Sequence, residues 1–141
     1  ASDVYKRQAD KPSYAVSPIL ALARITSAVT TRDGTGSTLI YSAAAVNGVR
    51  AQRVTAKAQG TTVAGTLALY VSTGSDTRLL TETLISAVTA TAAVTTWETT
   101  IDWSSVGLWL PAAYSFRASV TGATAATLAS PIDLVLWGAI A

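Results

Sequence analysis

The side chains that most often carry out chemistry are scarce in this sequence. The chain contains no cysteine, histidine or methionine, which excludes thiol nucleophiles, disulfides and structural zinc, and removes the commonest general base. A carboxylate pair remains, and Glu98 and Asp102 in "TWETTIDW" lie four residues apart on one face of an expected strand. At strand rise they are about 13 Å apart, wider than either carboxylate spacing used by glycosidases. We therefore expect no enzyme and predict no catalytic residue, cofactor or metal ligand.

The stretch "TRDGTGS" is the next candidate, since its two glycines suit a phosphate or metal loop. A phosphate loop needs a lysine and a following helix, whereas an apolar strand-like run, "STLIY", follows here. A calcium loop needs several carboxylates, and Asp33 stands alone. We predict a tight turn made by Arg32, Asp33, Gly34 and Gly36, which fixes the first hairpin, with Asp33 accepting a backbone hydrogen bond from residues 34–36. Asn47 and Gly48 predict a second turn.

Four tryptophans offer a different kind of site. Trp97 and Trp103 share the apolar parity of their strand and are expected in the core. Trp109 precedes a proline-marked turn, and Trp137 has the opposite parity to its leucine neighbours, so these two and Tyr14 are the candidate protein interface. A sugar-stacking platform needs two or three tryptophans on one outer face, which the parities do not supply.

Composition limits the partners. Half of the residues are hydrophobic and 13% are charged, about half of the usual share of roughly 25%. The net charge of +2, without a cluster of basic residues, argues against a nucleic-acid partner, and no apolar run is long enough to span a membrane. The charge-poor surface and the closing "DLVLWGAIA" indicate a homo-oligomer, most simply a trimer at a symmetry axis.

Alternation of period two predicts an all-β fold. Apolar runs such as "TLALYVS" and "YSFRASV" are separated by turn signals at regular spacing. The alternation of apolar and polar residues shifts by one position near Gln52 and Arg53, which predicts a β-bulge there. The expected strands are residues 19–28, 38–42, 50–58, 66–72, 78–86, 96–103, 113–120 and 132–139. About eight strands without crossover helices predict one antiparallel β-sandwich, jelly-roll-like or Greek-key.

The domain is expected to span residues 18–141, after an N-terminal arm of residues 1–17. "SDVYKRQ" resembles a translated sequencing-adapter remnant at the end of a metagenomic protein fragment, so residues 1–8 are expected to be non-native. "ADKPSYAVSP" has two prolines and no alternation, which suits an extended arm ordered by a partner. An edge strand of the same sandwich, with Tyr14 and Val16 filling a gap, is the alternative.

A longer pattern runs through residues 32–119. "TTRDGTGS", the Asn-Gly turn, "TTVAGTLALYVSTGSDTRLLTE" and "LPAAYSFRAS" together resemble a family of small virion structural proteins encoded by tailed bacteriophages. The Ala-rich C-terminal segment departs from the family's Asn- and Gly-rich tail, so nothing is carried over to the last strand.

The resemblance implies a non-enzymatic virion protein, expected on the capsid surface as a decoration or cement protein that binds the major capsid protein or other virion proteins. A tail, baseplate or fibre component is the alternative within the particle. A carbohydrate-binding or adhesive surface module is the alternative from another class.

Overall fold

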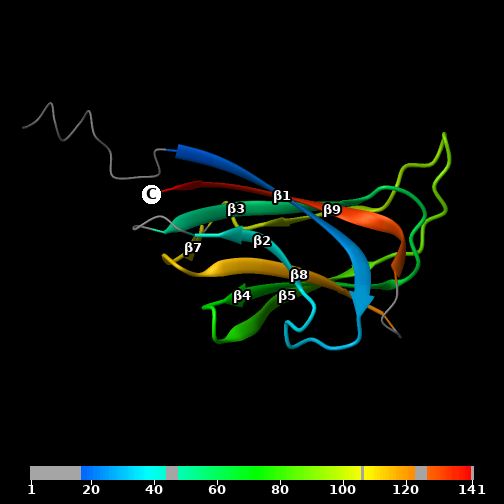
Figure 1. The fold of residues 1–141 in the computed structure, drawn as a ribbon. Coiled ribbons are helices and arrows are strands. Elements are labelled where there is room, and N and C mark those ends of the chain that lie inside the picture. The colour runs from blue at the N-terminus through cyan, green and yellow to red at the C-terminus, as the bar shows by residue number, and fades with distance from the viewer. Residues whose placement is uncertain (1–16, 44–47, 106, 123–126, 141) are drawn as a thin grey trace, which may run out of the picture.

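A computed structural model describes residues 17–43, 48–105, 107–122 and 127–140. Among them the chain forms nine strands and no helix (Figure 1). In order the strands are β1 (Ser17–Val29), β2 (Thr38–Ser42), β3 (Val49–Ala58), β4 (Gly65–Ser72), β5 (Thr77–Ile85), β6 (Glu98–Asp102), β7 (Leu108–Leu110), β8 (Ser115–Thr121) and β9 (Thr127–Ile140). In this part of the chain, no helix has the length and apolar character needed to cross a membrane.

The strands form two packed sheets. Sheet A has the order β1-β9-β3-β6, with the short β7 also pairing with β3, and sheet B has the order β2-β8-β4-β5. These two orders are those of a jelly roll, in which two Greek keys build two facing sheets. The end of β1 joins the sheets, because Ala28 and Val29 pair with Val120 and Thr121 of β8 in the one parallel contact among the described strands. The predicted all-β sandwich is confirmed.

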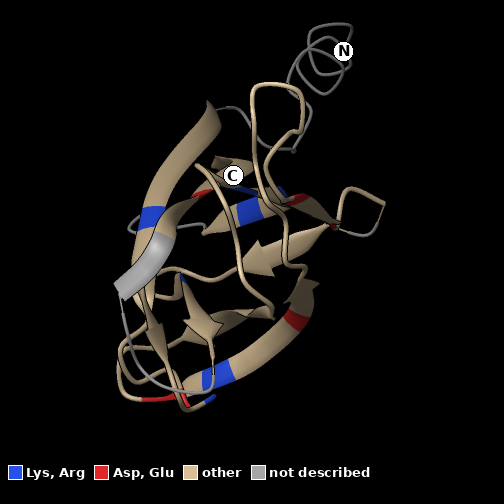
Figure 2. Ribbon diagram, turned by 90° about the vertical axis from the view of Figure 1, so that its right-hand side faces the viewer, with Lys and Arg blue, Asp and Glu red and all other residues tan. Residues whose placement is uncertain are grey.

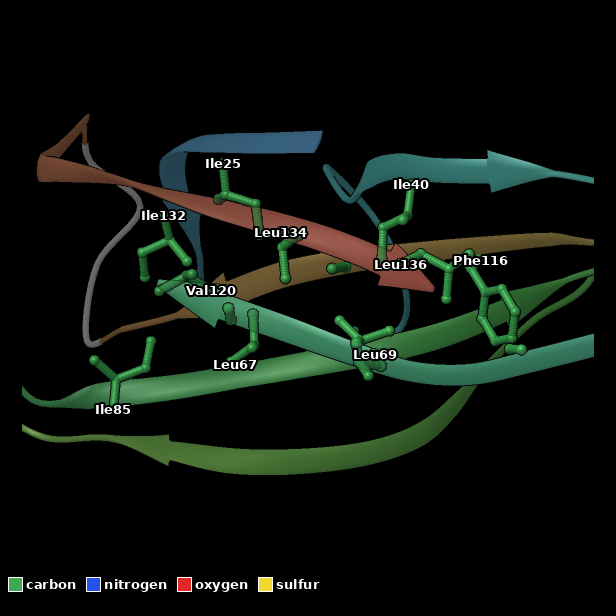
Figure 3. Packing of buried hydrophobic residues seen from close by; sticks show 14 of the residues in the cluster. Ile25, Ile40, Leu67, Leu69, Ile85, Phe116, Val120, Ile132, Leu134 and Leu136 are labelled. Carbon is green, nitrogen blue, oxygen red and sulfur yellow. The ribbon is translucent and has the colours of Figure 1, made fainter. Parts of the chain in front are cut away.

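The core lies between the sheets. Figure 3 shows the side chains of sheet A pointing toward those of sheet B. The buried cluster includes Ile25, Ile132, Leu134 and Leu136 from sheet A, and Leu67, Leu69, Phe116 and Val120 from sheet B. These positions alternate along their strands, as the period-two pattern requires.

Most of the strand predictions hold within two or three residues. The predicted bulge is confirmed, since the register of β3 with β9 shifts between Ala51 and Arg53. β7 is missing from the prediction. Its three residues lie between Gly107 and Pro111, and a glycine and a proline this close together indicate one continuous turn. β9 also begins five residues earlier than predicted. The predicted arm, residues 1–17, lies outside the described residues except for Ser17, which opens β1.

Candidate protein interface

The outer face of sheet A carries an apolar patch. Residues directly opposite each other on paired strands share a face, and β1 pairs in this way with β9. The apolar patch consists of Pro18, Leu20 and Leu22 on β1 and Val135, Trp137 and Ala139 on β9. Leu22 is 71% exposed, Leu20 57% and Trp137 38%. Large apolar side chains gathered on one face of a chain are typical of an interaction site.

Two arginines connect the apolar patch to Trp109. Arg50 of β3 lies opposite both Ala139 and Trp109. Arg53 lies opposite Trp137, with its guanidinium carbon 4.7 Å from the ring centre, a cation–π contact. Trp109, 51% exposed, and Trp137 therefore share one face, separated by two strand spacings across and two residues along the strand, or about 12 Å. This corrects the sequence interpretation, in which the two tryptophans did not come together on one outer face.

A charged row borders the apolar patch and is internally neutralised. Arg24 Nε donates to Asp133 Oδ1 at 2.7 Å, and Gln59 donates to the other oxygen at 3.0 Å. Lys57 Nζ lies 3.5 Å from Glu98 Oε2. The hydrogen bond from Arg24, followed by that from Gln59, lowers the pKa of Asp133 below its usual value. Figure 2 shows how few charges the strands carry. A partner on this face is therefore selected mainly by shape and apolar contact.

A polar hollow lies beside this row. It has a volume of about 820 Å³ and is lined by Thr55, Thr96, Thr99 and Thr100, by Lys57, Gln59, Glu98 and Asp133, and by apolar residues of β3 and β9. Its hydroxyl and amide groups, unlike the apolar patch, suit a hydrated or polar ligand.

The carboxylates considered for catalysis have separate partners. Glu98 pairs with Lys57, and Asp102 Oδ1 accepts a hydrogen bond from the backbone N–H of Ser104 at 2.7 Å. The hydrogen bonds from Ser104 lower the pKa of Asp102. No cluster of three or more potential metal ligands occurs among the described residues.

The "TRDGTGS" stretch is a turn, with the predicted hydrogen bond. Asp33 Oδ1 accepts hydrogen bonds from the backbone N–H of Thr35 at 3.0 Å and from Thr31 Oγ1 at 2.9 Å. The backbone hydrogen bond from Thr35 is the main cause that lowers the pKa of Asp33, and the bond from Thr31 adds to it. Gly34 and Gly36 have φ of +90° and +75°, a region that glycine enters at little cost.

The turn does not close a hairpin, so that part of the prediction is wrong. β1 and β2 are not paired with each other in the ladders; both lie along β8, which β1 meets in parallel and β2 antiparallel. The physical reason is that the end of β1 and the start of β2 follow one another along the same edge of β8, so the two strands cannot pair with each other.

Residues 30–37 cross the outer face of sheet B and hold it at both sides. Arg32 Nε lies 2.6 Å from Glu82 Oε1 on β5, and Gly34 approaches Thr77 so closely that a Cβ would stand 2.4 Å from Thr77 Cγ2. At the other side, Arg117 of β8 donates to the hydroxyl and carbonyl of Ser37 at 2.8 and 2.9 Å. We call residues 30–37 the covering loop.

Beneath the covering loop lies a buried polar pair. Tyr70 is fully buried but lies outside the core cluster, on the outer face of β4, and its hydroxyl is 3.0 Å from Ser119 Oγ. Close to this pair, Glu82 of β5 forms an ion pair with Arg32, and Arg78 lies 3.8 Å from Asp76. Arg32 was assigned only a local role from the sequence, since nothing in the pattern shows a contact fifty residues away.

The remaining predicted residues are placed as follows. Gly48 has φ of +78°, and a Cβ there would lie 2.4 Å from the carbonyl oxygen of Leu110, so it lies in a close turn. Asn47 and Tyr14 fall outside the described residues. Trp97 is buried, which confirms the core prediction for it, whereas Trp103 is partly buried and packs against the core by stacking on Phe116, with ring centres 6.0 Å apart.

Sequence reasoning missed the leucines of the apolar patch. In "PILALAR" both parities are apolar, so alternation gives no sign of which side faces solvent. Only the pairing of β1 with β9 assigns Leu20 and Leu22 to the face that carries Trp137.

Comparisons with known proteins give little beyond this geometry. No protein-family model matches the chain, and no curated protein matches it. Among solved structures, the chain is similar to the Eiger TNF of S. frugiperda, with 14% identity over 89% of this chain and 94% of that chain, at a TM-score of 0.46. A likeness this distant carries no functional argument.

Proposed function

We propose that the protein is a non-enzymatic structural protein of a tailed-bacteriophage particle, and that it decorates the capsid as a cement protein. The observation that carries the proposal is the outer face of sheet A, where Leu20, Leu22 and Trp137 are exposed beside Trp109 and two arginines. Tryptophan and arginine are the residues most enriched among interface hot spots. The resemblance of the sequence motifs in residues 32–119 to phage virion proteins supports a phage particle as the assembly.

The partner in this proposal is the major capsid protein or another virion protein. The charges that border the apolar patch are already paired, Arg24 with Asp133 and Lys57 with Glu98. A partner with an apolar, weakly charged surface therefore fits, whereas Arg50 and Arg53 are too few basic residues for a nucleic-acid footprint. Many copies on one shell make modest individual contacts effective through multivalency. A homotrimer on a symmetry axis of the shell belongs to the same proposal.

A tail, baseplate or fibre position would use the same face, so the jelly roll does not decide between them. A carbohydrate-binding module is a second candidate function, favoured by the shared face of Trp109 and Trp137 and by the polar hollow, whose lining residue Thr55 lies 3.5 Å from Trp137 Nε1. Against it, Arg53 already covers one side of the Trp137 ring, which leaves less of the ring for a sugar to stack on.

Co-sedimentation with shells tests the proposal. The probe is the shell assembled from the major capsid protein encoded on the same contig, mixed with the full chain. We expect stoichiometric binding, and we expect Trp109→Ala to weaken it at least tenfold, as for a hot-spot residue of about 2 kcal/mol. Leu84→Ala is the matched control, since Leu84 is 77% exposed on β5 of sheet B.

Other results of these measurements would contradict the capsid proposal or favour its alternative. Absence of binding to shells, or equal losses from the two variants, would contradict the capsid proposal. Binding to a glycan array that Trp109→Ala abolishes would favour the carbohydrate-binding alternative instead.

A further inference from the structure

Among the residues that the structure describes, one edge of β1 is open. From Ser17 to Ser27 this strand pairs with β9 on one side. On its other side, the described strands offer only the two-residue parallel contact of Ala28 and Val29 with β8. An edge strand presents a row of unpaired backbone N–H and C=O groups, which is a template for pairing with another chain.

The other edges are short, charged or irregular, as protected edges are. β6 has five residues and carries Glu98 and Asp102, and β7 has three. β2 has five residues, and its register shifts. β5 is longer, but its register also shifts, and it carries Arg78 and Glu82.

β1 is less protected in its first nine residues, where only Pro18 and Arg24 are residue types that protect an edge. The register with β9 is unbroken from Ser17 to Ile25 and shifts only after it. Arg24 is the one charge in this segment, and it is turned onto the sheet by its 2.7 Å contact with Asp133. The residues from Pro18 to Ala23 are all apolar.

We propose that two copies of this chain pair along this edge, β1 against β1, antiparallel about a two-fold axis at Ala21. Ala21 is the centre of the unbroken segment, so this register uses all nine of its residues. It places Leu20 of each copy opposite the partner's Leu22, and Arg24 opposite the partner's Pro18, so no like charges meet. A second copy supplies a matching edge because an isologous contact uses the same surface twice.

The axis stands perpendicular to the sheet, and the two outer faces therefore lie on the same side. The row that runs from Trp137 to Leu20 continues into the partner's Leu22, and the two apolar patches become one. The pair presents a bivalent face, which raises the avidity for any repeated partner. The pairing itself does not depend on the capsid proposal, because it concerns only copies of this chain.

Disulfide trapping tests the register directly, because the natural sequence has no cysteine. Opposite residues of an antiparallel pair have Cα atoms about 4.5–5.5 Å apart, within the range of a disulfide. The two variants Leu20→Cys and Leu22→Cys, mixed in equal amounts, are expected to form the mixed disulfide at least tenfold faster than either forms a disulfide with itself. Leu84→Cys, exposed on the edge strand β5, is the matched control and is expected to cross-link slowly.

Sedimentation of the full chain gives the second measurement. At tens of micromolar we expect an even number of copies, a dimer or, with an added three-fold contact, a hexamer. Leu22→Lys places a lysine next to the partner's Leu20 and is expected to abolish the two-fold contact while the fold, judged by circular dichroism, is retained.

A strict monomer or trimer overturns the proposal. So does cross-linking of the mixture no faster than that of Leu84→Cys, or fastest linking of one β1 variant with itself. Shell binding without self-pairing would leave the capsid proposal standing and refute this one.

Discussion

Replacing Gly34 by alanine is predicted to destabilise the whole domain, although Gly34 lies in a surface turn. Two costs add. The first is conformational, since φ at this position is +90°, and an L-residue with left-handed φ costs about 1–2 kcal/mol. The second is steric, since the new Cβ would lie 2.4 Å from Thr77 Cγ2, and overpacking of this kind costs about 1–3 kcal/mol.

The sum, about 2–5 kcal/mol from these two sources, corresponds to a fall in Tm of about 6–15 °C for a domain of this size. Gly74→Ala is the matched control, because Gly74 has φ of +102° and nothing within 4 Å of its Cβ position. It carries the conformational cost alone, so its Tm should fall by about 3–6 °C.

The double variant Gly34→Ala/Thr77→Ser separates the two costs. Serine lacks the methyl group that clashes but keeps the hydroxyl that donates to Ser72 Oγ at 3.1 Å. We expect thermal unfolding of the double variant to resemble that of Gly74→Ala once the effect of Thr77→Ser alone is subtracted, because contacting residues couple.

The reasoning fails if Thr77→Ser recovers nothing in the Gly34→Ala background, because the covering loop would then not lie on β5. It also fails if Gly34→Ala leaves the Tm unchanged while abolishing binding of a ligand. That outcome would make residues 31–37 a binding loop.

Two further predictions concern polar pairs. Tyr70→Phe leaves the Ser119 hydroxyl without its buried partner and should cost about 1–2 kcal/mol in urea unfolding, whereas adding Ser119→Ala should return part of that loss. The pKa of Asp133 is lowered mainly by the hydrogen bond from Arg24. Its stabilising contribution is therefore present above the unfolded pKa of about 3.9 and lost as the pH falls through the lower folded pKa. Asp133→Asn should remove that acid-dependent loss, and an unchanged pH profile between pH 5 and 2 would contradict this.

The sequence predicts the layers of this fold well and their connections poorly. The period-two pattern of Leu67 and Leu69, or of Trp97 and Ile101, identifies a strand and its core face because burial alternates with the pleat. The mismatch of parity at Gln52 predicts the bulge for the same reason. None of these patterns shows which strand lies beside which. The sequence therefore predicts neither the crossing of β1 between the sheets nor the contact of Arg32 with Glu82.

The candidate site shows the same limit more sharply. Trp137 was assigned to the surface because its parity opposes that of Leu134 and Leu136, and Trp109 because it precedes Pro111. The two tryptophans share one face because β9 and β7 pair with β3 on its opposite sides. Only the pairing of the strands in the structure shows this. Leu20 and Leu22 could not be assigned at all, since their strand is apolar on both sides.

The two outer faces of the sandwich differ in how far other residues of the chain cover them. On sheet B, the covering loop lies over Tyr70 and its hydrogen-bonded partner, and Arg32 and Arg117 hold it on either side. On sheet A, the paired charges that border the apolar patch leave Leu22 and Trp109 more than half exposed.

Burying an apolar side chain is worth about 25 cal/mol per Å², so the chain forgoes on sheet A a stabilisation of the kind that it obtains on sheet B. The connection that covers sheet B is drawn there by the crossing of β1, and no described segment reaches across sheet A. Stability of the isolated domain does not explain an open apolar face next to an unprotected edge. The two proposals would account for both features, because a second copy along β1 and a partner over Trp109 and Trp137 would together cover what the described residues leave open.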